Sequence, residues 1–95
     1  MLFVWDPQKA EANLKKHGVS FEAAQTVFDD PLHLSILDGK QRDEERWITV
    51  GRAIDHKTLI VVHLYKNMED QKEMIRIISA RQATKREVKQ YEEGI

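Results

Sequence analysis

Residues 76–91 have the sequence RIISARQATKREVKQY, and this stretch predicts a strand and the helix that follows it. The apolar residues at 77–78 favour a short strand that ends at Ser79-Ala80-Arg81. Thr84 followed three residues later by Glu87 is the pattern of a capping box, which predicts the start of a helix. The segment therefore indicates a strand, a short loop and a C-terminal helix.

The same segment is rich in basic side chains. They are Arg76, Arg81, Lys85, Arg86 and Lys89. A guanidinium group at the end of a strand is suited to holding a phosphate group through two parallel hydrogen bonds. This favours nucleic acid as a ligand. A solvated strand end followed by an ordinary surface helix has the same pattern, so the segment alone leaves both interpretations open.

The rest of the chain predicts two helices and then a series of strands. Strands are expected at residues 2–5, 32–37, 46–54, 58–65 and 74–80, and helices at about 7–17, 21–30 and from 85 onward. Asp6 and Ser20 are candidate N-caps, and Asp38 with Gly39 is a turn signal. The order β-α-α-β-β-β-β-α predicts an α+β domain. In it, two helices from the N-terminal half and a C-terminal helix pack on a mainly antiparallel sheet.

Length and composition indicate one globular domain spanning residues 1–95. Hydrophobic residues make up 41% of the chain and charged residues 33%, which is ordinary for a globular protein. There is no cysteine, so a disulfide framework or a thiolate zinc site is excluded. No apolar run approaches the roughly 20 residues that span a bilayer, and no signal peptide is recognisable. These features favour a cytoplasmic protein.

The net charge of −1 conceals an uneven distribution. Residues 20–45 carry seven acidic side chains against two basic ones, whereas residues 71–91 carry six basic side chains against two acidic ones. Affinity for nucleic acid rests largely on phosphate neutralisation, so a general DNA-coating protein would be more basic overall. The distribution favours a local site for an anionic ligand.

Metal and nucleotide cofactors are not expected. The four histidines, at positions 17, 33, 56 and 63, have no metal-binding spacing, and His63 is interpreted as a core residue of a buried strand. The serines lack a nucleophile-elbow motif, and no glycine-rich phosphate loop is present. The sequence therefore predicts no cofactor and no metal.

Basic groups around the sheet suit RNA cleavage without a metal. The set comprises His17, Arg46, Arg52, Arg76 and Arg81. If the strand at 46–54 is unbroken, Arg46 and Arg52 lie on one face with Ile48 and Val50, although Gly51 is a possible bulge. RNA supplies its own 2′-hydroxyl nucleophile, and cations stabilise the pentavalent phosphate. Each of these residues, taken singly, also fits a surface ion pair with the abundant acids.

The chain as a whole resembles a known family of bacterial toxins. The matching segments are Val4-Trp5-Asp6-Pro7 with Lys9, Asn13, Lys16-His17-Gly18-Val19-Ser20-Phe21, Ala24, Val27-Phe28, Asp30-Pro31, Glu45-Arg46, Gly51-Arg52, Arg76-Ile77-Ile78-Ser79-Ala80-Arg81, Ala83, Glu87 and Tyr91. In this order they are similar to the BrnT family, the toxin half of a type II toxin–antitoxin pair. Residues 66–73 are the least family-like part.

The resemblance implies a RelE-like fold and a metal-independent endoribonuclease that stops translation. It also implies neutralisation by a small ribbon-helix-helix antitoxin of the BrnA kind. By this resemblance Arg52 and Arg81 are expected to hold phosphate, with Arg46 and His17 as neighbouring site residues. Trp5, Asp6, Asn13 and Gly18 match the family as well, and we interpret them as architectural.

Two other functions remain open at this stage. The chain can be an inactive toxin-fold module that binds an antitoxin and modulates its DNA binding. It can also be a small-ligand domain with an anion pocket. Growth arrest on expression without the partner separates the toxin from the inactive module.

Overall fold

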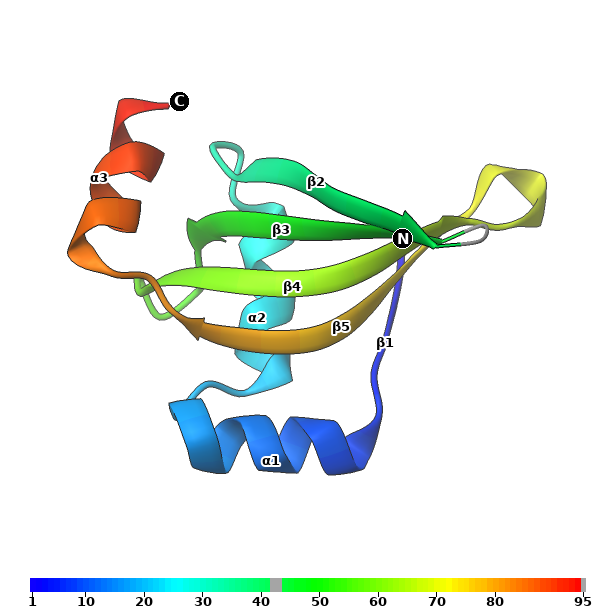
Figure 1. The fold of residues 1–95 in the computed structure, drawn as a ribbon, viewed down its shortest axis with the longest axis horizontal. Helices are drawn as coiled ribbons and strands as arrows, with labels where there is room; N and C mark the ends of the chain where they lie inside the picture. The colour runs from blue at the N-terminus through cyan, green and yellow to red at the C-terminus, as the bar shows by residue number, and fades with distance from the viewer. Residues whose placement is uncertain (42–43, 95) are drawn as a thin grey trace.

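The computed structural model describes residues 1–41 and 44–94, and it confirms the expected α+β class (Figure 1). A single mixed sheet is accompanied by α-helices and short 3₁₀-helices. In chain order the elements are β1 (Leu2–Val4), α1 (Pro7–His17), α2 (Phe21–Gln25), the 3₁₀-helix η1 (Thr26–Asp29), β2 (Leu34–Gln41), β3 (Glu44–Arg52), β4 (Thr58–Asn67), the 3₁₀-helix η2 (Glu69–Gln71), β5 (Glu73–Gln82) and α3 (Lys85–Glu93).

The sheet has the strand order β1-β5-β4-β3-β2. Neighbouring strands are antiparallel except for β1, which pairs in parallel with β5. The pairing of β3 with β4 runs without a register shift from Glu45 to Arg52. Gly51 is therefore not a bulge, and the prediction that Arg46 and Arg52 share one face is confirmed.

Asp38 and Gly39 do not form the predicted turn. They lie inside β2, where the register against β3 shifts between Leu37 and Gly39. An extra residue is tolerated here because β2 is an edge strand, and a bulge bends such a strand without ending it. The strand β2 continues to Gln41 and β3 begins at Glu44, and residues 42–43 lie outside the described residues. The connection between the strands expected at 58–65 and 74–80 is also shorter than predicted, because β4 extends to Asn67 and β5 begins at Glu73.

Each α-helix begins at the capping residue that the sequence indicates. The side chain of Asp6 accepts a hydrogen bond from the Gln8 amide, and that of Ser20 accepts one from the Ala23 amide. Thr84 caps α3, and its capping box is complete. These side chains satisfy amide groups that have no partner within the first turn of a helix.

The core lies between the sheet and the layer formed by α1, α2 and η1. Phe21, Ala24 and Val27 are fully buried, and Leu59, Val61 and Ile77 of the sheet pack against this layer. A Cβ atom on Gly51 would lie 2.6 Å from Cγ1 of Val27 and 3.0 Å from Cβ of His33. Glycine at this position therefore lets η1 approach β3 closely.

Asn13 attaches α1 to the free edge of β5. Its amide nitrogen donates hydrogen bonds to the carbonyl oxygens of Val19 (2.9 Å) and Ala80 (2.8 Å), and its amide oxygen accepts one from the Ala80 amide (3.1 Å). The side chain thus replaces a neighbouring strand at a point that β1 does not reach. Asn13 is the buried residue of α1, whereas Leu14 and His17 are exposed.

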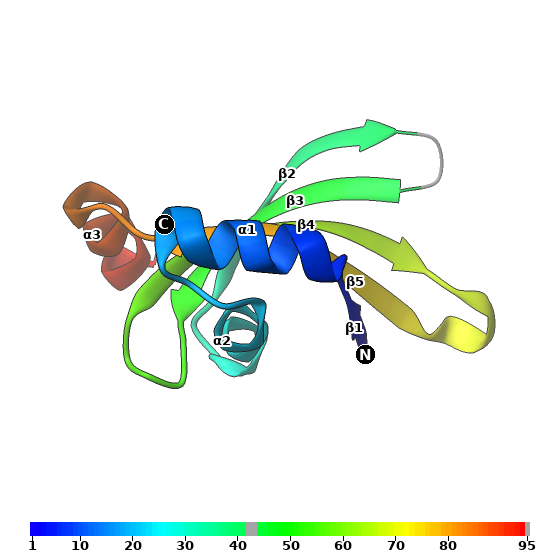
Figure 2. The same cartoon turned by 90° about the horizontal axis from the view of Figure 1, so that it is seen from below.

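The C-terminal helix does not cover a face of the sheet as expected. Figures 1 and 2 show α3 beyond the end of the sheet, next to the end of β3. Its only buried residue is Tyr91. The helix is held at this position by its contacts, because Glu87 pairs with Arg81 and Tyr91 donates a hydrogen bond to Asp30.

Replacing Asn13 with alanine is expected to lower the free energy of unfolding by about 3 kcal/mol, because three buried backbone groups lose their partner. Urea unfolding followed by circular dichroism measures this change. Lys16→Ala, an exposed position of the same helix, is the matched control and should unfold at nearly the wild-type urea concentration. Equal stability of Asn13→Ala and the wild type would show that Asn13 does not hold α1 in place.

Candidate functional site

One of the two faces of the sheet is not covered by any helix of the described residues (Figure 2). In β3, Trp47, Thr49 and Gly51 point to the helical layer, whereas Arg46 and Arg52 are exposed on the opposite side. We call this opposite side the open face. Its centre is apolar and includes Ile36, Ile48 and Val62, which are paired across β2, β3 and β4.

Four arginines frame the apolar centre of the open face. Across β3, β4 and β5, Arg46 aligns with Leu64 and Arg76 at one end. At the other end, Arg81 aligns with Ile60. Arg52 lies two residues further along β3 than the residue paired with Ile60, so it is the next side chain on the same face. Standard strand dimensions place the Cα atoms of Arg52 and Arg81 roughly 12 Å apart, whereas Arg46 and Arg52 are roughly 20 Å apart. The structure therefore brings Arg52 and Arg81 within reach of one ligand and keeps Arg46 away from them.

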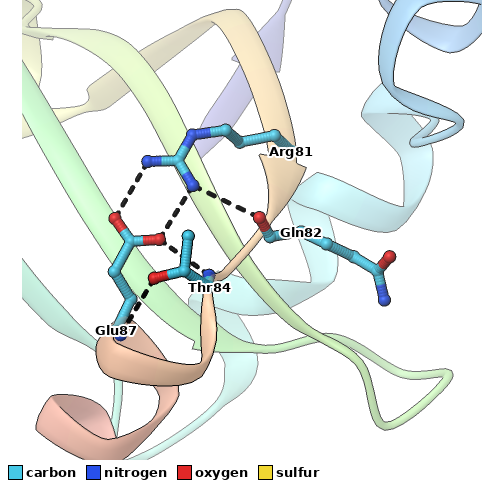
Figure 3. Close-up of polar contacts among 4 residues, drawn as sticks. All are labelled: Arg81, Gln82, Thr84 and Glu87. Carbon is cyan, nitrogen blue, oxygen red and sulfur yellow. Dashed lines mark hydrogen bonds and ion pairs between the residues drawn. The ribbon is translucent and has the colours of Figure 1, made fainter.

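Arg81 is held by Glu87 in a two-pronged ion pair (Figure 3). Its two terminal nitrogens donate to the carboxylate of Glu87 at 2.8 and 2.9 Å, and one of them also donates to the Gln82 carbonyl at 3.2 Å. The same carboxylate accepts a hydrogen bond from the Thr84 amide as part of the capping box. These hydrogen bonds, with that from Arg81 the strongest, lower the pKa of Glu87 to about 2. Arg81 therefore has a structural partner in α3.

Arg52 lies next to a hydrogen-bonded cluster centred on Asp30. One carboxylate oxygen of Asp30 accepts bonds from the Arg52 amide (2.8 Å) and the Tyr91 hydroxyl, and the other accepts one from the Leu32 amide (2.9 Å). Burial opposes ionisation of Asp30, but these hydrogen bonds lower its pKa below the usual value. Asp30 thereby ties the end of η1 to both β3 and α3.

The guanidinium group of Arg52 is available to a ligand. It lies 6.0 Å from the centre of the Tyr91 ring, and within residues 1–41 and 44–94 it makes no hydrogen bond or ion pair. A cavity of about 390 Å³ beside it is lined by residues of η1 and of the β3–β4 turn. They include Thr26, Asp29, Ile54 and His56. Among the described residues the guanidinium of Arg52 therefore has no hydrogen-bond or ion-pair partner, and open space lies next to it.

Arg46 and His17 are placed differently from the other two predicted site residues. Nε of Arg46 lies 3.2 Å from a carboxylate oxygen of Asp38, and both side chains are about half exposed, so this ion pair contributes little stability. His17 is the exposed last residue of α1, in the helix that runs along β5. In the described part of the chain no hydrogen bond or ion pair links His17 to an arginine of the open face.

His63 is a buried core histidine, as predicted. Its Nε2 atom lies 2.7 Å from the Thr49 hydroxyl, which in turn lies 2.7 Å from the Ser35 hydroxyl. Burial lowers the pKa of His63 to about 4, so the ring is neutral at physiological pH. The described residues contain no group of three or more histidine, aspartate or glutamate side chains arranged to hold a metal ion.

Sequence reasoning did not assign roles to Glu87, Asp30 and Tyr91. The capping box identified Glu87 as a residue at the start of a helix. The sequence did not indicate that its carboxylate also binds Arg81, which lies on the other side of the loop between β5 and α3. Tyr91 and Asp30 are far apart in the chain and meet only through folding. A signal existed in the matching segments of the family, which contain all three residues.

Comparison with protein families identifies the class of the protein. Residues 5–87 match the family described as ribonuclease toxin, BrnT, of type II toxin–antitoxin system. The match covers most of the 95 residues, so the chain belongs to the BrnT toxin family, as its sequence resemblance indicated. A search of curated proteins gave no match. None of the described helices is long and apolar enough to cross a membrane.

The ion pair between Arg81 and Glu87 is expected to make stability depend on pH. A carboxyl group whose pKa falls from 4.5 to about 2 on folding stabilises the protein fully above pH 4.5 and loses this contribution as the pH falls toward 2. Glu87→Gln should therefore lower the free energy of unfolding by roughly 1–2 kcal/mol near neutral pH, allowing for the partial exposure of Arg81, and by progressively less below pH 4.5.

Urea unfolding of both proteins across this pH range measures the difference. Glu93→Gln, which removes an exposed carboxylate from the same helix, should show no such pH-dependent difference from the wild type. A difference for Glu87→Gln that is the same at pH 7 and pH 3 would contradict the assignment.

Proposed function

We propose that this chain is an active endoribonuclease that cleaves RNA without a metal ion and so inhibits translation in the cytoplasm. The observation that carries the proposal is the strand register at the end of the open face, which puts the Cα atoms of Arg52 and Arg81 roughly 12 Å apart by standard strand dimensions. Two arginine side chains can span this separation to one phosphate group. The free guanidinium of Arg52 and the cavity beside it support this placement. Family membership supports ribonuclease activity in general.

The proposed reaction uses a nucleophile that RNA itself provides. The 2′-hydroxyl oxygen attacks the adjacent phosphorus, the bond to the 5′-oxygen breaks, and a 2′,3′-cyclic phosphate is left. Negative charge accumulates on the phosphate oxygens in the transition state. Guanidinium groups already positioned at those oxygens stabilise this charge without a large rearrangement. In the proposal, Arg52 and Arg81 fill this role.

Arg81 must exchange its partner to do so. An RNA phosphate would replace the carboxylate of Glu87 as the acceptor of the two guanidinium hydrogen bonds. The side chain of Arg81 is 42% exposed and so remains accessible from the open face. While RNA is absent, the carboxylate of Glu87 occupies the position of the phosphate and keeps the side chain of Arg81 oriented.

Arg46 and His17 are proposed as secondary members of the site. Arg46 lies on the same open face and can contact a more distant phosphate of the same strand, as can Arg76. The ion pair of Arg46 with Asp38 is exposed, so phosphate can compete with it. His17 lies on α1 beside β5 and is proposed as a neighbour of Arg81 around the edge of the sheet. The arrangement of open sheet and flanking helices is proposed to be RelE-like.

The proposed partner is a ribbon-helix-helix antitoxin of the BrnA kind. The type II family implies a protein antitoxin. We propose that it covers the end of the open face near Arg52 and Arg81 and so blocks access of phosphate. Complementary charge would speed this association more than it strengthens it. Binding to DNA is proposed to occur only through the antitoxin, since the toxin chain has a net charge of −1.

A second candidate function is a catalytically inactive module that binds an antitoxin. The observation that favours this second function is the ion pair of Arg81 with Glu87, in which both terminal nitrogens of the guanidinium donate to the carboxylate. If that pair does not open, only Arg52 remains free at the proposed site.

Arg52→Ala and Arg81→Ala are each expected to slow RNA cleavage by about 10²–10³, since each removes a charged contact to the transition state worth roughly 2–4 kcal/mol. Initial rates on a single-stranded RNA, together with growth after induction without antitoxin, measure the effect. Arg86→Ala removes an exposed arginine of α3 and should stay within a few-fold of the wild type.

Glu87→Gln separates the two roles of Arg81. It breaks the same ion pair but keeps the guanidinium, so it should retain most of the activity. If Glu87→Gln is as impaired as Arg81→Ala, Arg81 acts by anchoring α3. If the wild type neither cleaves RNA nor arrests growth, the inactive-module interpretation is correct.

Cleavage is expected to continue in excess EDTA and to leave 2′,3′-cyclic phosphate or 3′-phosphate ends. The reason is that the 2′-hydroxyl provides the nucleophile and the guanidinium groups stabilise the charge on the phosphate, which are the two roles that a metal ion would otherwise fill. Mass spectrometry of the products identifies the ends. Activity that EDTA abolishes and magnesium or manganese restores would refute the mechanism and direct attention to the acidic residues.

A further inference from the structure

The helical layer covers only part of its face of the sheet. Figure 2 shows the paired ends of β2–β3 and β4–β5 extending beyond α1 and α2. A cavity of about 200 Å³ lies on this side of the sheet, where Phe28 of η1 meets the strands. Its lining is dominated by rings, which come from Phe28, His33, Trp47, His63 and Tyr65.

The rings of this cavity are packed against one another. Phe28 contacts His63 edge-on with ring centres 4.9 Å apart, and His33 lies 6.0 Å from Phe28 on another side. Nδ1 of His33 donates to the Asp30 carbonyl at 2.7 Å, which fixes the orientation of that ring. His63 is uncharged, because burial lowers its pKa to about 4. The floor of the cavity therefore presents mainly aromatic surface, and Met1 completes part of its lining.

Two carboxylates stand beside the aromatic rings. Glu45 lies directly across from Tyr65 in the pairing of β3 with β4, and its Oε1 accepts a hydrogen bond from Nε1 of Trp47 at 3.1 Å. Glu73 lies two residues before Ile75, the partner of Tyr65 in β5, and so shares its face. Burial raises the pKa of Tyr65, and the nearby charges of Glu73 and Glu45 raise it further.

We propose that this cavity binds a basic side chain, a lysine or an arginine, presented by a partner protein. Aromatic faces attract cations, and the attraction is stronger where carboxylates lie close by. Glu45 and Glu73 would repel the phosphates of RNA, so the site does not suit the nucleic acid proposed for the open face. The occupant is instead a cationic group whose stem fits against Phe28, Trp47 and Tyr65.

The cavity and the open face lie on opposite sides of the sheet, so the two sites can be occupied independently of each other. Trp47 and Tyr65 face the helical layer, whereas the arginines at 46 and 52 face the opposite side of the same strands. A protein with a basic segment can therefore occupy the cavity while the open face holds another ligand. The inference does not rest on ribonuclease activity, and its test needs no catalytic measurement.

Nuclear magnetic resonance of the full chain labelled with ¹⁵N tests the proposal. N-acetyl-arginine methylamide is titrated in, and the indole N–H signal of Trp47 should shift with saturation. The indole signal of Trp5, which packs against Phe21 in the core, serves as an internal reference and should not move. N-acetyl-norleucine methylamide is the uncharged comparison, and uridine 5′-monophosphate is the anionic one. Neither should saturate the site in the same concentration range.

The double variant Glu45→Gln and Glu73→Gln should weaken binding of the arginine derivative about tenfold or more. Glu11→Gln with Glu22→Gln removes the same number of charges from exposed helical positions and should leave the affinity unchanged. If the norleucine derivative binds with the same affinity as the arginine derivative, the cavity is an apolar pocket that does not select for a cation. Binding of uridine monophosphate would indicate a nucleobase pocket, and an unshifted Trp47 signal would mean that no cation binds. Each of these results would overturn the proposal.

Discussion

The amide of Asn13 holds the helical layer to one side of the sheet, and the other features of the molecule depend on that placement. It pairs with the backbone of Ala80 at a free strand edge and with the carbonyl of Val19 just beyond α1. The first pairing fixes α1 against β5, and the second fixes the start of the chain that leads into α2. With both helices on one side, the opposite face of the sheet has no helix over it. The proposed function depends on this uncovered face.

Glu87 links the end of the fold to the proposed site. One carboxylate completes the capping box of α3 and also binds both prongs of Arg81. One helical turn later, Tyr91 bonds to Asp30 and lies beside Arg52. The helix α3 thus contacts both arginines that are proposed to hold phosphate. A change in α3 would therefore alter stability and the proposed site together, because the same side chains serve both.

The net charge of −1 conceals two surfaces of opposite character. The open face carries arginines at both ends of an apolar centre, and the far side of the same strands carries an aromatic cavity beside Glu45 and Glu73. Because neighbouring residues of a strand point to opposite faces, Glu45, Trp47 and Tyr65 are separated by the sheet from Arg46 and Arg52. A phosphate and a basic side chain would thus meet different sides of the molecule.

The sequence by itself determined the local structure. It predicted the capped starts of the helices, the alternation of Arg46 and Arg52 with apolar residues, and the burial of His63, because each depends on residues that are close in the chain. It also indicated the BrnT family, because many short matches occur in one order. Only the tertiary structure decided that Asp38 and Gly39 form a bulge rather than a turn, that α3 lies at the end of the sheet, and that Arg81 is paired with Glu87. Bulges, helix placement and ion pairs across loops depend on contacts between distant segments, and no local pattern of residues records such contacts.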